Sequence, residues 1–248
     1  MFMKRIIIVI LSANLLISVS CDSDNMSCFK KAGDVRTQNE SLPSFNTITV
    51  NSNFELVLNQ EQTNSISITA GKNLISHVKF DVINNELTIE DKNKCNWLRD
   101  YVPIKIQINF VDLKNLNIYH ACDVSVKDTL KLQKLVIENR ADILTTNFVI
   151  ECEILEFRSH ASTGDYRFSG NVDYSYIYNI GNGYFFGGNM STKTMHIVHR
   201  SLGRAIINVN DLLMIEDIKY GKVELRYGCP EIDKGDNEFG NLFENFGC

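Results

Sequence analysis

The sequence lacks several features that would assign it to a common functional class. Its 25 basic and 30 acidic residues leave a net charge of −5, so it offers no basic excess for binding nucleic acid. Its seven cysteines include no Cys-x-x-Cys pair that would suggest a redox or zinc site. The apolar run at residues 6–17 has about twelve residues, too few to cross a bilayer. Nucleic-acid binding, zinc or redox chemistry and a membrane-spanning helix are therefore not expected.

The first 21 residues have the pattern of an export signal. Lys4 and Arg5 precede the apolar run, which ends in Ser18, Val19, Ser20 and Cys21. A cysteine after small residues at this point resembles the bacterial lipoprotein signal, so we expect a lipoprotein signal peptide over 1–21 and lipid attachment at Cys21. A plain secretory signal with an incidental cysteine is the alternative. Residues 22–43 are polar and show no apolar periodicity, which predicts a flexible tether.

One short pattern returns six times between Leu113 and Tyr227. Each pass has a small residue, a turn residue, and two apolar positions separated by one residue. The small residues follow one another at steps of 19, 23, 18, 21 and 18, and they are Cys122, Ala141, Gly164, Asn182, Gly203 and Gly221. The turn residues are Asp123, Asp142, Asp165, Gly183, Arg204 and Lys222. The apolar positions are Val124/Val126, Ile143/Thr145, Tyr166/Phe168, Tyr184/Phe186, Ala205/Ile207 and Val223/Leu225. A period near 20 indicates a repeat architecture.

The alternation within each pass has a period of two, which is typical of strands. Further apolar pairs precede the turns, at Leu116/Ile118, Leu135/Ile137, Leu155/Phe157, Tyr176/Tyr178 and Met195/Ile197. About 20 residues are too few for a propeller blade, and the Leu/Asn ladder of leucine-rich repeats is absent. We therefore predict an all-β fold, a right-handed parallel β-helix (solenoid) with about 20 residues per coil, forming one domain over 44–248. An antiparallel sandwich is the alternative.

The runs FNTITVNSNFELVLNQ, GKNLISHVKFDVINNELTIED and VELRYGCPEIDKGDNEFGNL flank and close this pattern. With them the chain resembles the "putative auto-transporter adhesin, head GIN domain" family of Gram-negative lipoproteins, over about Phe45 to Asn241. The resemblance implies a β-helical, secreted or lipid-anchored protein at the cell surface or outer membrane. The family's corners are usually Gly-Ser-Gly, and this chain keeps only fragments of them, such as Gly181 to Gly183. The adhesin label itself is an analogy with autotransporter passengers.

Acidic residues give the sequence its main candidates for chemistry. Asp123, Asp142 and Asp165 are expected to fall in one column, where a cation could sit; the alternative is that Asp simply favours tight turns. Arg140, Arg158 and Arg167 lie near them in sequence, as in polysaccharide lyases, which share the β-helix. No tight set of acids appears, so a carbohydrate-active enzyme is the alternative to a binding protein without catalysis.

Aromatic and histidine residues give a second set of candidates. If exposed, Tyr174, Tyr176, Tyr178, Tyr184, Phe185 and Phe186 could stack against sugar rings. Period-two placement instead favours a core position for Tyr176, Tyr178, Tyr184 and Phe186. His120 and His160 are expected at related corners with Asn139 between them, and His196 and His199 on another coil; surface positions are expected for the histidines, because their spacing is not that of a metal site.

The six cysteines after Cys21 leave the disulfide pattern open among fifteen pairings. Cys122 and Cys152 are expected to be buried free thiols. Cys229 with Cys248 would close the last loop, and Cys28 with Cys95 would hold the tether. Taken together, the sequence predicts a lipid-anchored envelope protein that binds a polysaccharide or a host or cell-surface ligand, with no cofactor, metal or nucleic acid.

Overall fold

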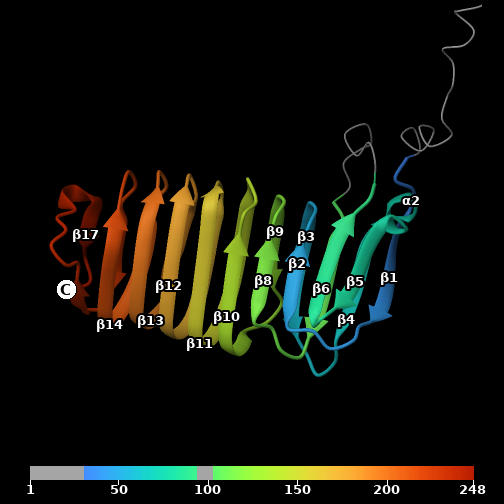
Figure 1. Ribbon diagram of the computed structural model, residues 1–248, viewed down its shortest axis with the longest axis horizontal. Helices are drawn as coiled ribbons and strands as arrows, with labels where there is room; N and C mark the ends of the chain where they lie inside the picture. The colour runs from blue at the N-terminus through green and yellow to red at the C-terminus, as the bar shows by residue number, and fades with distance from the viewer. Residues whose placement is uncertain (1–30, 94–102) are drawn as a thin grey trace, which may run out of the picture.

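The computed structural model describes residues 31–93 and 103–248. The signal peptide, Cys21 and the Cys28–Cys95 pairing lie outside the described residues. The described chain winds into a parallel β-helix with about 20 residues between stacked coils, which confirms the predicted fold (Figure 1). The earlier elements are β1 (Val35–Ser41), β2 (Thr47–Val50), β3 (Phe54–Gln60), β4 (Ser65–Gly71), α2 (Lys72–Ile75), β5 (Val78–Ile83), β6 (Glu86–Asp91), β7 (Lys105–Phe110), β8 (Asn115–Ile118) and β9 (Cys122–Val126). The later elements are β10 (Leu130–Asn139), β11 (Leu144–Ser162), β12 (Asp165–Gly181), β13 (Tyr184–Ser201), β14 (Ala205–Ile218), β15 (Val223–Tyr227), β16 (Glu231–Asp233), η3 (Gly240–Leu242) and β17 (Phe243–Asn245).

Parallel pairing links each coil to the next and excludes the antiparallel sandwich. Strands β10 to β14 pair in sequence order. The coil of β2 and β3, however, lies between β6/β7 on one side and β8/β9 on the other, all in parallel (Figure 1). The stack therefore begins before the repeats at Leu113, and its early coils are not in chain order.

The end of the stack that carries β1 is closed by antiparallel pairs. β1 pairs with β4, β4 with β7, and β5 with β6. Asn84 and Asn85 join β5 to β6 in a tight two-residue turn, with φ of 51° and 64°, values that asparagine tolerates well. The tether prediction is wrong for Val35–Ser41, whose side chains are all exposed but whose backbone pairs with β4. A polar sequence alone does not distinguish a solvent-exposed edge strand from a flexible tether.

Apolar side chains fill the interior in columns that run along the solenoid axis. Phe148 stacks on Phe168 with ring centroids 5.4 Å apart, and Phe168 on Phe185 at 5.5 Å. Phe157 lies 4.9 Å from Tyr166 and 5.2 Å from Phe168. All five rings are almost fully buried, and such ring pairs add about 0.5–1.5 kcal/mol each beyond their burial.

The column of small residues holds in four coils and shifts in two. Cys122 pairs with Leu144, not with Ala141, and the register that pairs Asp165 with Tyr184 places Gly183, not Asn182, beside Gly164. Gly203 and Gly221 keep their predicted places. The shift turns Ile143 and Tyr184 outward, at 55% and 44% exposed, and turns Leu144 and Phe185 inward. The two shifts are three residues and one residue long, and a shift by an odd number of residues moves every side chain of a strand to its other face.

The far end of the stack is tied by a disulfide. Cys229 and Cys248 are bonded across a sequence separation of 19 residues, as expected. This links β16, η3 and β17, the last partial coil, to the end of β15. Cys122 and Cys152 are buried free thiols, also as expected. Burial raises the pKa of Cys122 to about 12, so this thiol is not a nucleophile at neutral pH.

A buried polar column lines one inner corner of the coils. Asn139, Ser159, Asn179 and His199 are register partners on consecutive strands and are fully buried. Asn179 Nδ2 donates to the Gly183 carbonyl at 3.0 Å, and His199 Nε2 to the equivalent Gly203 carbonyl at 2.7 Å. These two side chains therefore donate to buried turn carbonyls, and the Gly183 carbonyl also accepts from Ser201 Oγ at 2.7 Å. The expectation of a surface position is therefore wrong for His199.

The His199 column predicts a loss of stability in mild acid. Nε2 donates to a carbonyl and Nδ1 faces the Asn179 amide at 3.4 Å, so a second ring proton would meet another donor. Burial accordingly lowers the pKa of His199 below its ordinary value of 6.5. Below that pH the unfolded chain gains a proton that the folded chain does not, and the free energy of unfolding should fall by up to about 1.4 kcal/mol per pH unit.

Urea unfolding between pH 7.5 and pH 5 measures this slope. His199→Asn keeps an amide at the position that Asn139 and Asn179 occupy, and it should lose this part of the pH dependence. His196→Asn, at an outward position of the same strand, is the control and should keep it. Equal slopes for wild type and His199→Asn would contradict the assignment.

Candidate functional site

Three tyrosines stand side by side on the outer surface of β12. Tyr174, Tyr176 and Tyr178 are half-buried and point outward, whereas Ser175 and Ile177 between them are fully buried. The core prediction is therefore wrong for Tyr176 and Tyr178, as it is for Tyr184 and half-buried Phe186. We call the outer surface of the second halves of β10 to β14, centred on these three side chains, the tyrosine face.

The register across coils explains the outward placement. Tyr176 is the partner of Glu156 on β11 and of His196 on β13, and a column holding a carboxylate belongs outside. Asp173 and Tyr174 are both turned away from the interior, which resets the alternation after Val172. The signal for exposure was therefore present in the neighbouring coils, at Glu156 and His196, and not within the tyrosine run itself.

Side chains of the flanking coils hold the tyrosine rings in place. The Arg158 guanidinium lies 5.5 Å from the Tyr176 ring centroid. The His196 ring meets Tyr176 edge-on at 5.1 Å, and the His160 ring lies 5.3 Å from Tyr178. Burial, with a smaller contribution from Glu216, raises the pKa of Tyr176, so its phenol stays protonated and can donate a hydrogen bond. The result is a pre-ordered surface of aromatic rings and hydroxyl groups.

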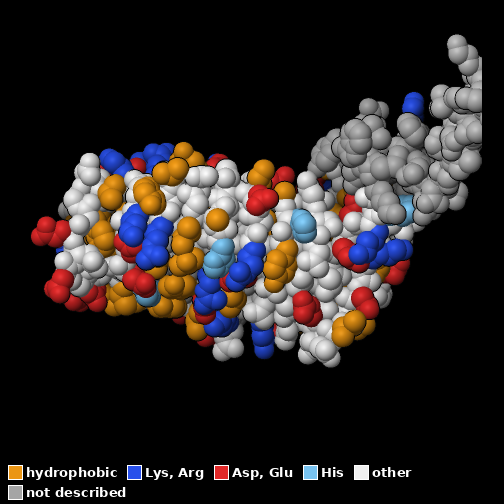
Figure 2. Space-filling view, turned by 45° about the horizontal axis from the view of Figure 1, so that its top comes forward, with side chains coloured by type: hydrophobic (Ala, Val, Ile, Leu, Met, Phe, Trp, Pro, Cys, Tyr) orange, Lys and Arg blue, Asp and Glu red, His pale blue; other side chains and the backbone are white. Residues whose placement is uncertain are grey.

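Charges on the tyrosine face are balanced by ion pairs. Glu138 lies 2.9 Å from Arg140 and 2.8 Å from His160, and Glu156 contacts Arg158 and lies 2.6 Å from Lys134. Further along, His196 lies 2.9 Å from Glu216, and Arg200 lies 2.6 Å from Asp217. Figure 2 shows hydrophobic, basic, acidic and histidine side chains interleaved over the part of the molecule formed by β10 to β14. Paired charges create little net field, which favours an uncharged ligand.

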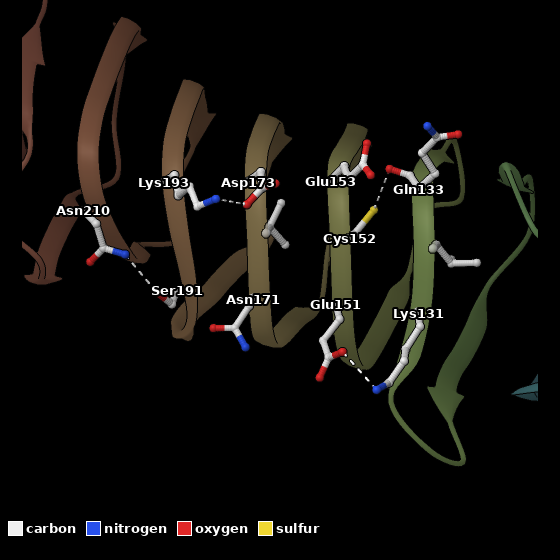
Figure 3. Close-up of a pocket in the computed structure, with 12 residues that line it drawn as sticks. Lys131, Gln133, Glu151, Cys152, Glu153, Asn171, Asp173, Ser191, Lys193 and Asn210 are labelled. Carbon is white, nitrogen blue, oxygen red and sulfur yellow. Dashed lines mark hydrogen bonds and ion pairs between the residues drawn. The ribbon is translucent and has the colours of Figure 1, made fainter.

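A shallow groove borders the tyrosine face at the bend of the same strands (Figure 3). It encloses about 690 Å³ and runs across five coils, where strand pairing skips Gln133, Glu153 and Asp173. Lys193 lies 2.7 Å from Asp173, and Asn210 donates to Ser191 at 2.9 Å. The remaining lining residues are Lys131, Leu132, Glu151, Cys152, Asn171 and Val172. Because Asp173 directly precedes Tyr174, groove and tyrosine face form one continuous surface of rings, amides and paired charges.

The acidic column expected from the sequence is not assembled. Asp123 pairs with Thr145, and Asp142 lies outside that row in the shifted coil. Asp165 forms an ion pair with Arg167 at 2.5 Å, while Arg140 and Arg158 belong to the tyrosine face. Within residues 31–93 and 103–248, no group of three or more His, Cys, Asp or Glu could hold a metal ion. Asp123, Asp142 and Asp165 are therefore not brought together with the three arginines in one cluster.

Comparison with known proteins gives one family and several solved structures. The family model described as "Putative auto-transporter adhesin, head GIN domain" matches residues 44–228. The chain is similar to a putative adhesin from Bacteroides fragilis, with a TM-score of 0.73 and 17% identity over 88% of this chain and 96% of that one. It is also similar to a putative lipid binding protein from Parabacteroides distasonis, with a TM-score of 0.59 and 20% identity over 88% of this chain and 98% of that one. A putative adhesin from Parabacteroides merdae has a TM-score of 0.56 and 16% identity over 88% of this chain and 97% of that one. No curated protein matches. At these identities the solved structures establish the fold alone.

Proposed function

This chain belongs to the "putative auto-transporter adhesin, head GIN domain" family, and from that premise we propose that it is an exported, lipid-anchored surface protein that binds carbohydrate. The ligand is a neutral polysaccharide chain lying on the tyrosine face, and no bond is broken. Cys21 carries the lipid. The observation that carries the proposal is the outward row of Tyr174, Tyr176 and Tyr178 on a rigid sheet.

The chemistry of the tyrosine face supports a sugar ligand. Sugar rings present apolar C–H faces and a rim of hydroxyls, which match aromatic rings surrounded by paired charges and amides. The groove beside the rings adds amide and hydroxyl groups from Asn171, Ser191 and Asn210. The surface spans five coils, about 19 Å at the usual strand spacing, and this length suits an oligomer better than a single sugar.

The position of the anchor supports presentation of this surface away from a membrane. Val35 begins the first strand at the capped end of the stack (Figure 1), and only 13 residues separate it from Cys21. A lipid on Cys21 therefore holds the capped end, which is the end of the stack that carries β1 and its antiparallel pairs, near the bilayer. Strands β10 to β14 lie further along the solenoid, with β2/β3 and β8/β9 between them and the cap.

Binding of neutral oligosaccharides tests the proposal. Hexasaccharides of β-linked glucose, N-acetylglucosamine, xylose and mannose are titrated by calorimetry against the wild type. The variant Tyr174→Ala/Tyr176→Ala/Tyr178→Ala should bind the best of these ligands with an affinity lower by about tenfold or more, which is equivalent to about 1.4 kcal/mol of binding free energy. Because these side chains point outward, the variant should still fold and unfold cooperatively, at a somewhat lower temperature since the rings are half-buried.

The matched control replaces three exposed tyrosines elsewhere, Tyr119→Ala/Tyr184→Ala/Tyr220→Ala, and should bind as the wild type does. Equal losses in both triple variants, or no binding by any hexasaccharide, would refute a sugar site on the tyrosine face. Release of new reducing ends during the titration would favour the carbohydrate-active enzyme instead.

A further inference from the structure

A second hollow lies on a different part of the coils, over the first halves of β12, β13 and β14 and the end of β15. It encloses about 260 Å³ and is lined by Arg167, Phe186, Gly188, Asn189, Ile206, Arg226 and Tyr227. A smaller hollow of about 160 Å³ adjoins it and shares Arg167, Phe186 and Asn189. We call the two together the arginine pocket. None of its lining residues belongs to the tyrosine face or the groove.

Irregular strand pairing opens the arginine pocket. Between the pairs Phe186–Ile206 and Thr192–Val209, β13 advances six residues and β14 only three. The extra residues of β13 include Gly187 and Gly188, and the Asn208 amide donates to the Gly188 carbonyl at 3.3 Å. A Cβ at Gly188 would lie 3.1 Å from Ile206 Cγ2 and 3.8 Å from the Tyr227 ring. A side chain at this position would therefore occupy the hollow.

A bulge in the next strand places one of the arginines. Between the pairs Ile207–Leu225 and Asn208–Tyr227, β15 advances two residues and β14 one, so Arg226 is the extra residue. Bulges commonly re-aim a side chain beside a functional site. The register shifts after Arg167, Phe186 and Ile207 thus all border one hollow. Other register shifts in these coils lie elsewhere.

The arginine pocket is lined by two cations and no acid. Each arginine pairs with one carboxylate, Asp165 or Glu224, but neither carboxylate lines the hollow, so the charged groups that face it are guanidinium groups alone. The Arg167 guanidinium lies 4.5 Å from the Phe186 ring centroid and is fixed by one contact to Asp165 at 2.5 Å. Arg226 donates Nε and Nη2 to Glu224 at 3.0 and 2.7 Å. A guanidinium has five N–H donors, so both arginines keep donors for a ligand after these contacts. Oriented guanidinium groups of this kind favour a carboxylate.

We propose that the arginine pocket binds a uronic-acid residue of an acidic glycan. The carboxylate would lie between Arg167 and Arg226, and the sugar ring against Phe186 and Tyr227, with Asn189 at its hydroxyl rim. The volume suits one or two sugar units. This is a second, charge-selective site beyond the neutral-sugar surface of the proposed function, and it stands independently of that surface.

Titration with α-1,4-linked trigalacturonate, against neutral α-1,4-linked trigalactose, tests the proposal by calorimetry. The wild type should bind the acidic trimer at least about tenfold more tightly than the neutral one, and added salt should weaken binding. Arg167→Gln, Arg226→Gln and the pocket-filling Gly188→Val should each lower affinity for trigalacturonate by about tenfold. The triple tyrosine variant should bind it unchanged, which separates this site from the tyrosine face.

The control Arg140→Gln removes an arginine of comparable exposure that is also paired with a glutamate, and it should bind trigalacturonate as the wild type does. Thermal unfolding verifies that each variant is folded, and Arg226→Lys provides a milder second variant. Equal affinity for the two trimers, no binding of trigalacturonate, an equal loss in Arg140→Gln, or a loss confined to the tyrosine variant would each overturn the proposal.

Discussion

Replacing Gly221 by alanine should lower the free energy of unfolding by about 3 kcal/mol, within the upper range for overpacking a tightly packed site. A Cβ at this position would lie 2.0 Å from the Gly203 carbonyl oxygen and 2.7 Å from that of Ser201. Both obstacles are backbone atoms of the preceding coil, so no side chain can rotate away to relieve the clash. Urea unfolding at pH 7.5 measures the loss directly.

Gly235→Ala is the matched control for this substitution. Nothing lies within 4 Å of a Cβ at Gly235, but its φ of +55° is a left-handed conformation, so alanine there costs about 1 kcal/mol of backbone strain alone. The additional loss of unfolding free energy in Gly221→Ala, relative to Gly235→Ala, therefore measures the effect of the close approach between one coil and the next. An equal or smaller loss at Gly221 would show that the two coils do not stack at this corner.

Replacing Cys21 by serine should release the protein from the membrane. The wild type should incorporate labelled palmitate and sediment with membranes, because each buried CH₂ of an acyl chain contributes about 0.8 kcal/mol and several chains act together. Without the thiol no lipid can be attached, and the membrane-to-soluble ratio should fall by about 100-fold or more. Fractionation of expressing cells with palmitate labelling provides the measurement.

Cys28→Ser is the control, because it removes a cysteine seven residues further along and leaves Cys21 in place. It should sediment like the wild type. A Cys21→Ser protein that still sediments with membranes and carries label would show that the anchor lies elsewhere. Soluble wild type without label would favour the plain secretory signal.

The overall fold could be predicted from the sequence because two simple constraints coincide in every coil. Alternating apolar residues give inward-facing columns, and small residues are needed where backbones approach closely. In the sequence, Gly164, Gly203 and Gly221 directly mark the corners at which the backbones approach closely. The spacing between stacked corner residues varies, however, so a fixed template misplaced Ala141 and Asn182. Only the pairing between neighbouring strands distinguishes Asn182 from Gly183.

Exposure of individual side chains was harder to predict for the same reason. Within β12 the tyrosines alternate as core residues would, and nothing local marks them as outward. The deciding information lies on the adjacent coils, about 20 residues away in sequence, at Glu156 and His196. His199 is the reverse case: a polar residue that faces inward because it replaces the amide of Asn179 in a buried column.

The order of the first coils could not be predicted from local pattern at all. β2 and β3 pair with β6 and β7 on one side and with β8 and β9 on the other. These contacts join segments that are tens of residues apart, and alternation alone does not specify partners. The arginine pocket was missed likewise, because bulges in β13 and β15 are departures from the repeat used to align the coils.

Hydroxyl-radical footprinting of the wild type, with and without the best-binding neutral hexasaccharide, tests the central claim most directly. If sugar lies on the tyrosine face, oxidation of Tyr174, Tyr176 and Tyr178 should fall when ligand is bound. Oxidation of Tyr184 and Tyr220, exposed on other surfaces, should stay constant. Unchanged oxidation at the three β12 tyrosines, with protection elsewhere, would contradict the account.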